Sequence, residues 1–180
     1  MSQGDRTVCF DLETQRTFDE VGGRNNLDQL GLAAAVIYDS VRSEYLAYTE
    51  DQALQLVEAL SEADRVVGFN LVDFDYLVLQ PYTDCPLQTL PTVDMLQHIH
   101  RVLGFRLPLH TLADATLGAG KSADGLQSVR WFREGELEKV IEYCQRDVEI
   151  TWKLYEHGRQ HRHVLYWDRR GQMQKVLTTW

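Results

Sequence analysis

The order in which strand-like and helix-like patterns follow one another is the feature that most constrains the fold of this chain. Residues 6–14 form a short apolar run typical of a buried strand. Residues 30–39 and 43–49 look like two more strands, and the turn between them is short enough that the pair should be antiparallel. A helix then precedes a fourth strand at 65–69. Three meandering strands followed by crossover units predict an α/β fold with a mixed, five-stranded sheet flanked by helices.

Capping residues and apolar stripes locate the remaining elements. Thr49 opens a helix, because Gln52 three residues later completes a capping-box spacing. Leu54, Val57 and Leu60 make the apolar stripe of that helix. The other expected elements are a helix over 71–79 capped by Asn70, a weak strand at 89–93, helices at 94–103, about 110–117, 122–133 and 136–158, and a C-terminal hairpin over 164–180.

The charge of the chain is unevenly distributed. A length of 180 residues, 44% of them hydrophobic, fits one globular domain over 1–159 followed by a hairpin appendage over 160–180. The net charge of −9 argues against a surface that grips nucleic acid along its length. Residues 1–150 hold 12 Lys and Arg against 25 Asp and Glu (−13), whereas residues 151–180 hold 6 against 2 (+4). The basic tail is either a substrate-contacting edge or a solvated appendage.

Neither a membrane protein nor a disulfide framework is indicated. No apolar run reaches the ~18 residues needed to cross a bilayer, and the first six residues lack a signal-peptide pattern. A cytoplasmic protein without membrane contact is therefore expected. Cys9, Cys85 and Cys144 are far apart and odd in number, which suits neither paired disulfides nor a zinc site. Buried free thiols are the preferred interpretation for Cys9 and Cys144.

Acidic residues that follow two of the strands are the first candidates for chemistry. Asp11 and Glu13 stand two apart on the first strand, so both project from the same face. Such carboxylates repel each other unless a cation lies between them, and Mg²⁺ or Mn²⁺ suits an all-oxygen site. After the fourth strand, Asp73 is placed to cap the helix that Asn70 begins. Asp75 has no such structural role and is the better ligand candidate. For Asp11 and Glu13 the alternative is a solvent-facing strand end.

A tyrosine and an aspartate in the last long helix complete the set. Tyr143 and Asp147 are four apart and are therefore neighbours on one helix face. The hydroxyl of Tyr143 is placed to position a water beside a metal held by Asp147. The alternative is a tyrosine at the rim of the core and a surface aspartate. Each signal is weak alone, but the order Asp-x-Glu, Asn-x-x-x-Phe-Asp and Tyr-x-x-x-Asp is hard to reach by chance.

In this order the motifs resemble those of DEDD-type 3′–5′ exonucleases of the RNase H-like superfamily, in the tyrosine-bearing (DEDDy) branch. More narrowly, the chain is similar to bacterial predicted exonucleases related to the proofreading domain of family B DNA polymerases. The matching motifs are Asp11-Leu12-Glu13-Thr14, Asn70-x-x-x-Phe74-Asp75 and Tyr143-x-x-x-Asp147. The likeness covers about residues 6–158 and leaves the hairpin outside. The histidine branch requires a histidine at position 142, where this chain has Glu142.

The resemblance implies an RNase H-like fold and hydrolysis of phosphodiester bonds from the 3′ end with release of nucleoside monophosphates. It implies two divalent ions, Mg²⁺ or Mn²⁺, held by Asp11, Glu13, Asp75 and Asp147, with Tyr143 orienting the attacking water. Substrate contacts are expected from Leu12, Thr14, Asn70, Phe74 and Lys121. The expected substrate is a single-stranded 3′ end, with DNA preferred and RNA open. A helicase or polymerase partner that delivers this end is also left open.

Two other functions are alternatives: an RNase H-like endonuclease or structure-selective nuclease, and a nucleic-acid-binding adaptor without turnover. Residues 118–122 suggest a phosphate loop, but Ala115 stands where that pattern needs glycine. Lys121 in this loop is either a phosphate contact or a solvated lysine. The histidines between 157 and 163 lack the cysteine or acidic partners of a zinc site. The aromatic residues of the hairpin either stack unpaired bases or pack the hairpin onto the body. Asp94 is expected to cap the helix that it begins.

Overall fold

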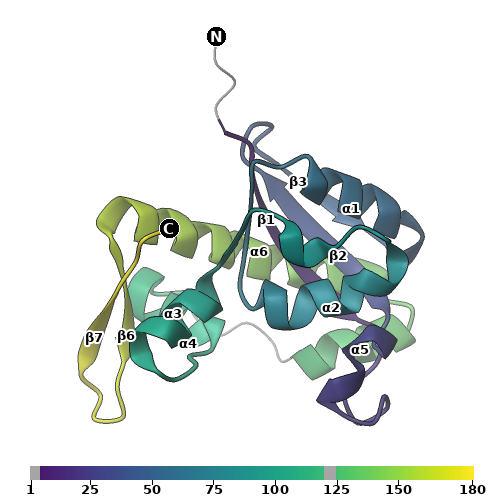
Figure 1. The fold of residues 1–180 in the computed structure, drawn as a ribbon. Helices are drawn as coiled ribbons and strands as arrows, with labels where there is room; N and C mark the ends of the chain where they lie inside the picture. Colours follow the sequence, from purple (N-terminus) through teal and green to yellow (C-terminus); the bar gives the residue numbers. More distant parts are fainter. Residues whose placement is uncertain (1–4, 120–124) are drawn as a thin grey trace.

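A mixed five-stranded sheet forms the centre of the protein. The computed structural model describes residues 5–119 and 125–180, and Figure 1 shows the sheet with helices on both faces. The strand order is β3-β2-β1-β4-β5, in which β2 is antiparallel to β1 and β3, whereas β4 and β5 run parallel to β1. The strands are β1 (Thr7–Thr14), β2 (Leu32–Asp39), β3 (Glu44–Tyr48), β4 (Arg65–Gly68) and β5 (Thr92–Asp94). The predicted α/β fold with a mixed five-stranded sheet is confirmed.

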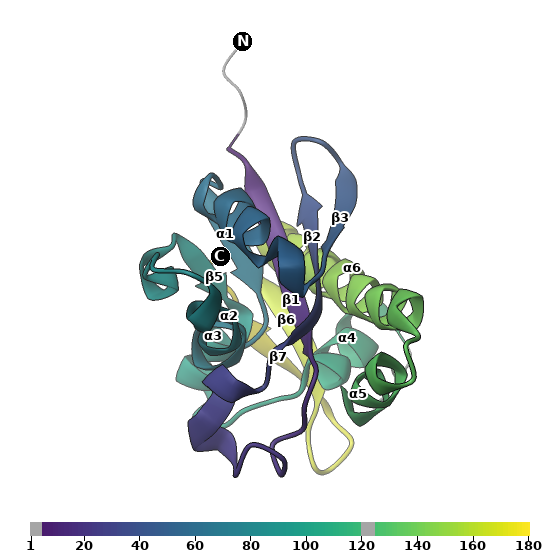
Figure 2. The same ribbon diagram turned by 90° about the vertical axis from the view of Figure 1, so that its right-hand side faces the viewer.

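Two groups of helices cover the two faces of this sheet. α1 and α2 pack on one face, and α6, a helix of 25 residues, crosses the other face beside α5 (Figure 2). The helices are α1 (Ala53–Ser61), α2 (Tyr76–Leu79), α3 (Met95–Leu103), α4 (Leu109–Leu117), α5 (Gly125–Arg133) and α6 (Leu137–His161). Short 3-10 segments are η1 (Arg24–Gln29), η2 (Glu50–Gln52), η4 (Gln80–Tyr82) and η5 (Leu87–Thr89), and η3 (Leu71–Asp75) is a π-helical turn.

Side chains of β1 alternate between two separate cores. Phe10 and Leu12 pack with residues of α1 and α2, whereas Cys9 packs with residues of α6. Because successive side chains of a strand point to opposite faces, Asp11 and Glu13 lie on the same face as Cys9. The alternation therefore places both carboxylates beneath α6.

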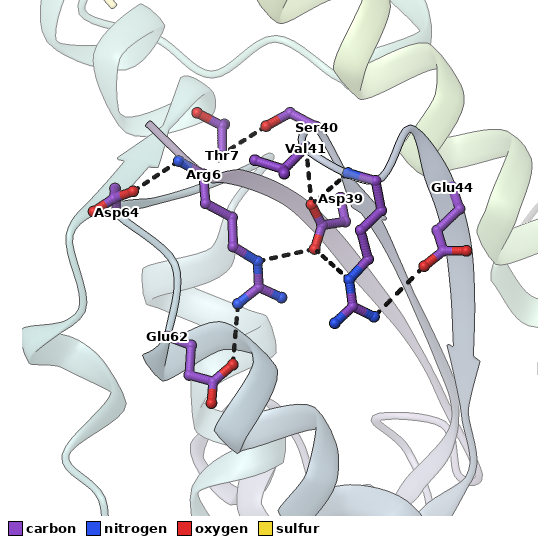
Figure 3. A network of polar contacts seen from close by, with 9 residues as sticks. Arg6, Thr7, Asp39, Ser40, Val41, Glu44, Glu62 and Asp64 are labelled. Atoms are coloured by element: carbon purple, nitrogen blue, oxygen red, sulfur yellow. Dashed lines mark hydrogen bonds and ion pairs between the residues drawn. The ribbon is translucent and has the colours of Figure 1, made fainter. Parts of the chain in front are cut away.

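A polar network fixes the start of β1, the end away from Glu13. Asp39 is 0% exposed and accepts the backbone N–H groups of Val41 (2.9 Å) and Arg42 (3.2 Å) and the Nε of Arg6 (2.9 Å) (Figure 3). Burial acts to raise the pKa of Asp39, but these donors outweigh it and hold the pKa below its ordinary value. The N–H of Arg6 also donates to Asp64 at 2.7 Å. Arg6, the residue before β1, thereby contacts both the end of β2 and the residue that precedes β4.

The segment after β4 differs from the predicted helix, because η3 is a π-helical turn and α2 is a single turn. Asn70 has a left-handed φ of 76° and its side chain caps nothing. Instead, the carboxylate of Asp94 accepts the N–H groups of Asn70 (2.9 Å) and Val72 (3.1 Å). It also accepts the N–H of Gln97 at 3.2 Å and so caps α3, as predicted. The predicted cap by Asn70 is wrong, because a residue distant in sequence supplies the acceptor.

The apolar stripe of α1 also differs from the prediction, although the predicted capping box forms. Leu54 is 67% exposed, whereas Ala53, Leu56, Val57 and Leu60 are buried. The first turn after Thr49 is the 3-10 segment η2, and the α-helix proper begins only at Ala53. The buried face is therefore centred on Leu56 and Leu60, and Leu54 points to solvent.

The C-terminal residues form the predicted hairpin, which packs on α3, α4 and α6 (Figure 1). Its antiparallel strands are β6 (His163–Trp167) and β7 (Met173–Leu177). Val164 and Val176 are fully buried in a hydrophobic cluster shared with these helices. The indole of Trp180 donates to the carbonyl of Tyr155 at 3.1 Å and lies against Gly158, where a Cβ atom would be 2.6 Å away. Only a glycine at 158 permits this contact.

Cys9 and Cys144 are buried free thiols, as predicted, and Cys85 is free and partly buried. The helix predicted over 122–133 is observed from Gly125 onward, and residues 122–124 lie outside the described part of the chain. Over residues 5–119 and 125–180, no helix combines the length and the hydrophobicity that crossing a bilayer requires.

Candidate metal centre and substrate cleft

Three carboxylates from β1 and α6 meet at one point. Asp11 and Glu13 project from β1 and Asp147 from α6, and one oxygen of each lies within 4.8 Å of the others. The pairing of β1 with β2 shifts register between Glu13 and Thr14. Irregularities of this kind re-aim side chains at the ends of strands and are frequent beside active sites. The structure thus brings together the first and third sequence motifs.

Asp75 lies beside this group and has a structural role. Its carboxylate is 2% exposed and accepts the N–H of Leu12 at 3.2 Å. β4 pairs with β1 only as far as Cys9 and Val67, so Asp75 satisfies a β1 donor beyond the end of β4. The side chain of Asp75 does not cap a helix, as predicted, but it has this structural contact with β1, which the sequence does not predict. Asp75 is outside the group of three mutually close carboxylates, but its charge raises the pKa of Asp11.

Burial and mutual repulsion raise the pKa values of these carboxyls. Desolvation holds the pKa of Asp11 well above its ordinary value, and the charges of Asp75, Glu13 and Asp147 add to this effect. Desolvation raises the pKa of Glu13 to about 8, against the lowering effect of a hydrogen bond from Ser128. Desolvation likewise raises the pKa of Asp75 to about 7, although backbone hydrogen bonds oppose it. A cation among these groups would stabilise all of their charged forms.

Two residues that the sequence does not single out as functional complete the surroundings of the carboxylates. Ser128 on α5 is 1% exposed, and its hydroxyl donates to Glu13 at 2.5 Å. The same hydroxyl lies 2.8 Å from the carbonyl oxygen of Gly125. The thiol of Cys144 donates to the carbonyl of Asp11 at 3.3 Å. No motif signals Ser128, because its contact depends on how α5 packs against β1.

A cleft of about 440 Å³ opens onto the three carboxylates. Its walls come from the end of β1 and the loop that follows, from η3 and from the start of α5. Among the residues predicted to contact substrate, those that line the cleft are Leu12, Thr14 and Phe74. The rings of Phe18 and Phe74 meet edge to face in this wall, with their centroids 6.0 Å apart. An acidic floor with apolar, aromatic walls can accept a phosphate through bound cations and a base through stacking.

The remaining predicted site residues lie elsewhere. Tyr143 is buried one helical turn before Asp147, and its ring contacts Trp131 edge to face at 6.2 Å between centroids. Neither Tyr143 nor Asn70 lines the cleft. The side chain of Asn70 accepts a hydrogen bond from Arg106, a residue that the sequence did not single out. Lys121 lies outside the described residues.

Asp73 does not cap the turn η3, in which it is the third residue. Its side chain is exposed, and its carboxylate pairs with the guanidinium of Arg106 at 3.4 Å. The predicted capping role of Asp73 is therefore wrong, because Asp94 already occupies the N–H groups of the turn.

The group of three carboxylates fits a divalent metal ion. Its donors are all carboxylate oxygens, which hard cations such as Mg²⁺ and Mn²⁺ prefer. Within residues 5–119 and 125–180, Asp11, Glu13 and Asp147 are the one group of His, Cys, Asp and Glu spaced to hold a metal. The rings of His157 and His161 lie 4.4 Å apart between centroids but belong to no such group.

A comparison with protein-family models identifies the superfamily of the chain. A family model described as the RNase H superfamily matches residues 8–158, from β1 almost to the end of α6. The chain belongs to the RNase H superfamily. Nucleases with this fold use divalent metals and act on nucleic acid, and the acidic cluster supplies suitable ligands.

The fold is also similar to part of the family B DNA polymerase from the hyperthermophilic archaeon Pyrobaculum calidifontis. The match has a TM-score of 0.65 and 17% sequence identity and covers 86% of this chain and 24% of the polymerase. The chain therefore spans about a quarter of that polymerase, and at this identity the likeness shows the fold alone. No curated protein sequence matches the chain.

Proposed function

We propose that this protein is a metal-dependent 3′–5′ exonuclease that hydrolyses single-stranded nucleic acid, DNA in preference to RNA, and releases nucleoside monophosphates. The observation that supports this most directly is the meeting of Asp11, Glu13 and Asp147 within 4.8 Å on the floor of a cleft, with Asp75 beside them. The likeness of the three motifs to those of DEDDy exonucleases supports the direction of attack. A helicase or polymerase that exposes a single-stranded 3′ end is the proposed class of partner.

Each acidic residue has a proposed role as a ligand. Asp11, Glu13, Asp75 and Asp147 hold two divalent cations, Mg²⁺ or Mn²⁺. When bound, such ions supply Lewis-acid activation of water and stabilise charge on the leaving oxygen. They also reverse the sign of the local charge, which allows a strongly acidic body to receive a polyanion.

The other residues of the site bind and orient. The hydroxyl of Tyr143 is proposed to orient the attacking water, and Ser128 holds the carboxylate of Glu13 in place through its hydrogen bond. Leu12 and Phe74 in the cleft wall are proposed to pack against the terminal nucleotide. Ordered packing of this kind holds the scissile bond in line with the water.

The test is a release assay on oligonucleotides labelled at either end, in Mg²⁺ and in Mn²⁺. The expected products of a 5′-labelled strand form a ladder that shortens from the 3′ end. Asp147→Asn should lower kcat by about 100-fold or more, because a metal ligand is lost. Glu149→Gln, two positions further along α6 in an exposed ion pair with Lys153, is the matched control and should retain activity.

Four results would count against the proposal. Shortening from the 5′ end would reverse the polarity, and activity unchanged in Asp147→Asn would remove the site. Cleavage of a circular single strand would favour the endonuclease, since a strict exonuclease cannot start on a circle. Binding of single strands without turnover in any divalent metal would favour the adaptor.

A further inference from the structure

A second cleft lies between the hairpin and the loop that joins α3 to α4. Its volume is about 590 Å³, and it is lined by both aromatic and basic side chains. Phe105 and Tyr166 line it, with ring centroids 6.1 Å apart in an edge-to-face contact. Trp167, which also lines it, is 45% exposed, and Phe105 is 47% exposed. Large rings that remain this exposed offer flat apolar surfaces for stacking.

Two arginines at the hairpin turn give this cleft its charge. Arg169 and Arg170 line it, both are exposed, and within the described residues neither guanidinium is in an ion pair. The neighbouring acid, Asp168, is engaged in building the turn. Its carboxylate accepts the N–H groups of Arg170 (2.8 Å) and Gln172 (2.9 Å) and the amide of Gln174 (3.0 Å). The turn therefore presents two positive charges toward solvent.

The hairpin is fixed to the body, so this cleft has a defined shape. The hydroxyl of Thr116 on α4 accepts the N–H of Leu165 at 2.8 Å and lies 3.1 Å from its carbonyl oxygen. On the other strand, the ring of His98 on α3 contacts the carbonyl of Leu177 at 3.0 Å. Contacts to two helices hold β6 and β7 in place.

Among the described residues none lines both clefts, but a short series of contacts leads from one to the other. Arg106 lines the second cleft. Its guanidinium contacts the side chain of Asn70, just before the turn η3, and that of Asp73 within the turn. Phe74, the next residue of that turn, lines the catalytic cleft. Both figures place the hairpin turn and the end of β1 in the lower half of the molecule, and Figure 1 shows them apart across its width, with α3 and α4 beside the hairpin. The path inferred for a single strand therefore runs from the catalytic cleft past η3 to Arg106 and then to the hairpin.

We propose that this hairpin cleft binds the single-stranded nucleic acid upstream of the 3′ end that occupies the catalytic cleft. Arg106, Arg169 and Arg170 contact backbone phosphates, and a base stacks on Trp167 and Phe105. The proposal rests on the proposed exonuclease function for its direction. Unpaired strands fit better than a duplex, because exposed rings can stack only on bases that are not paired within a helix.

The test compares a dinucleotide with a single strand of about 12 nucleotides, long enough to reach both clefts. Arg169→Ala with Arg170→Ala, and separately Trp167→Ala, should raise KM for the longer strand about tenfold and leave dinucleotide hydrolysis unchanged. The double variant should also lower the slope of log affinity against log salt by about 1.4, since each single-strand phosphate contact contributes about 0.7. Arg42→Ala with Lys153→Ala removes the same charge from exposed positions outside both clefts and is the control.

Direct binding separates this inference from the proposed function. Fluorescence anisotropy with the labelled longer strand and no divalent metal reports the hairpin cleft even if the protein cleaves nothing. Weaker binding by the hairpin variants without any nuclease activity would defeat the exonuclease proposal and sustain the binding site. Normal cleavage with unchanged affinity in those variants would sustain the exonuclease proposal and defeat the binding site. Equal affinity for duplex and single strand would overturn the hairpin cleft as proposed. An equal rise in KM for the dinucleotide and for the longer strand would also overturn it.

Discussion

At the scale of residues, the buried carboxyls of the site respond to pH in a direction set by their burial. In the metal-free protein, folding raises the pKa of Glu13 from 4.5 to about 8 and that of Asp75 from 3.8 to about 7. The folded protein thus holds these protons more tightly than the unfolded chain. Their contribution to stability is complete below the ordinary pKa values and is lost as pH rises through the raised ones. We expect the Tm of the metal-free protein to fall between about pH 5 and pH 8.

Thermal melts of the wild type and Glu13→Gln check this expectation. The variant cannot ionise at position 13 and should show a shallower fall. The pKa of His157 is lowered, mainly by burial, so its contribution has the opposite sign. The effect of Glu13 is therefore read from the difference between the two proteins in the slope of Tm against pH. Mn²⁺ should raise the Tm most at the alkaline end, where its ligands are deprotonated. Identical slopes for the two proteins would contradict the raised pKa of Glu13.

The sequence predicted some of these residues and missed others for a physical reason. A spacing of two on a strand and of four on a helix fixes which side chains share a face, so the grouping of Asp11 with Glu13 could be predicted. Ser128 donates to Glu13 across 115 positions of sequence, and only the packing of α5 determines that contact. The contact of Arg106 with Asp73 has the same origin in tertiary structure.

At the scale of elements, one carboxylate organises the junction of β4, η3 and α3. Asp94 is buried and accepts the N–H groups of Asn70, Val72 and Gln97. Asp94→Ala leaves these donors without their acceptor, and we expect the free energy of unfolding to fall by about 2–4 kcal/mol. Because η3 ends at Asp75, loss of the turn should also weaken Mn²⁺ binding.

Denaturant unfolding and a Mn²⁺ titration measure the two effects separately. Asp114→Ala on the exposed surface of α4 is the control and should change the free energy of unfolding by less than about 0.5 kcal/mol. Asp94→Asn keeps one acceptor oxygen and should lie between the wild type and the alanine variant. A destabilised Asp94→Ala protein that still binds Mn²⁺ with wild-type affinity would show that η3 does not position Asp75.

Elements built from local patterns were predictable, and those built by distant contacts were not. The apolar runs of β1 and β2 and the short turn between β2 and β3 predicted the antiparallel part of the sheet. The residues after β4 also carried a helical pattern. Their first turn is π-helical, and its acceptor, Asp94, lies 24 residues from Asn70. No local pattern contains that information.

At the scale of the whole molecule, charge and topology act together. The chain carries a net charge of −9, with the excess positive charge in its last 30 residues. The fold places the turn of the basic hairpin toward the same end of the molecule as the end of β1 (Figure 2). The sequence predicted the hairpin and the basic tail, but not the packing of the hairpin against α4 through Thr116 and Leu165. That packing forms the second cleft.

The central claim is that acidic residues distant in sequence capture a pair of divalent cations in one cleft. The most direct measurement is the anomalous scattering of a crystal of the full chain soaked in Mn²⁺ with a nucleoside monophosphate. Two peaks are expected about 4 Å apart, both in contact with Asp11 and flanked by Glu13, Asp75 and Asp147. A folded protein with no peak at Asp11, or with peaks only at the histidines near the end of α6, would contradict it.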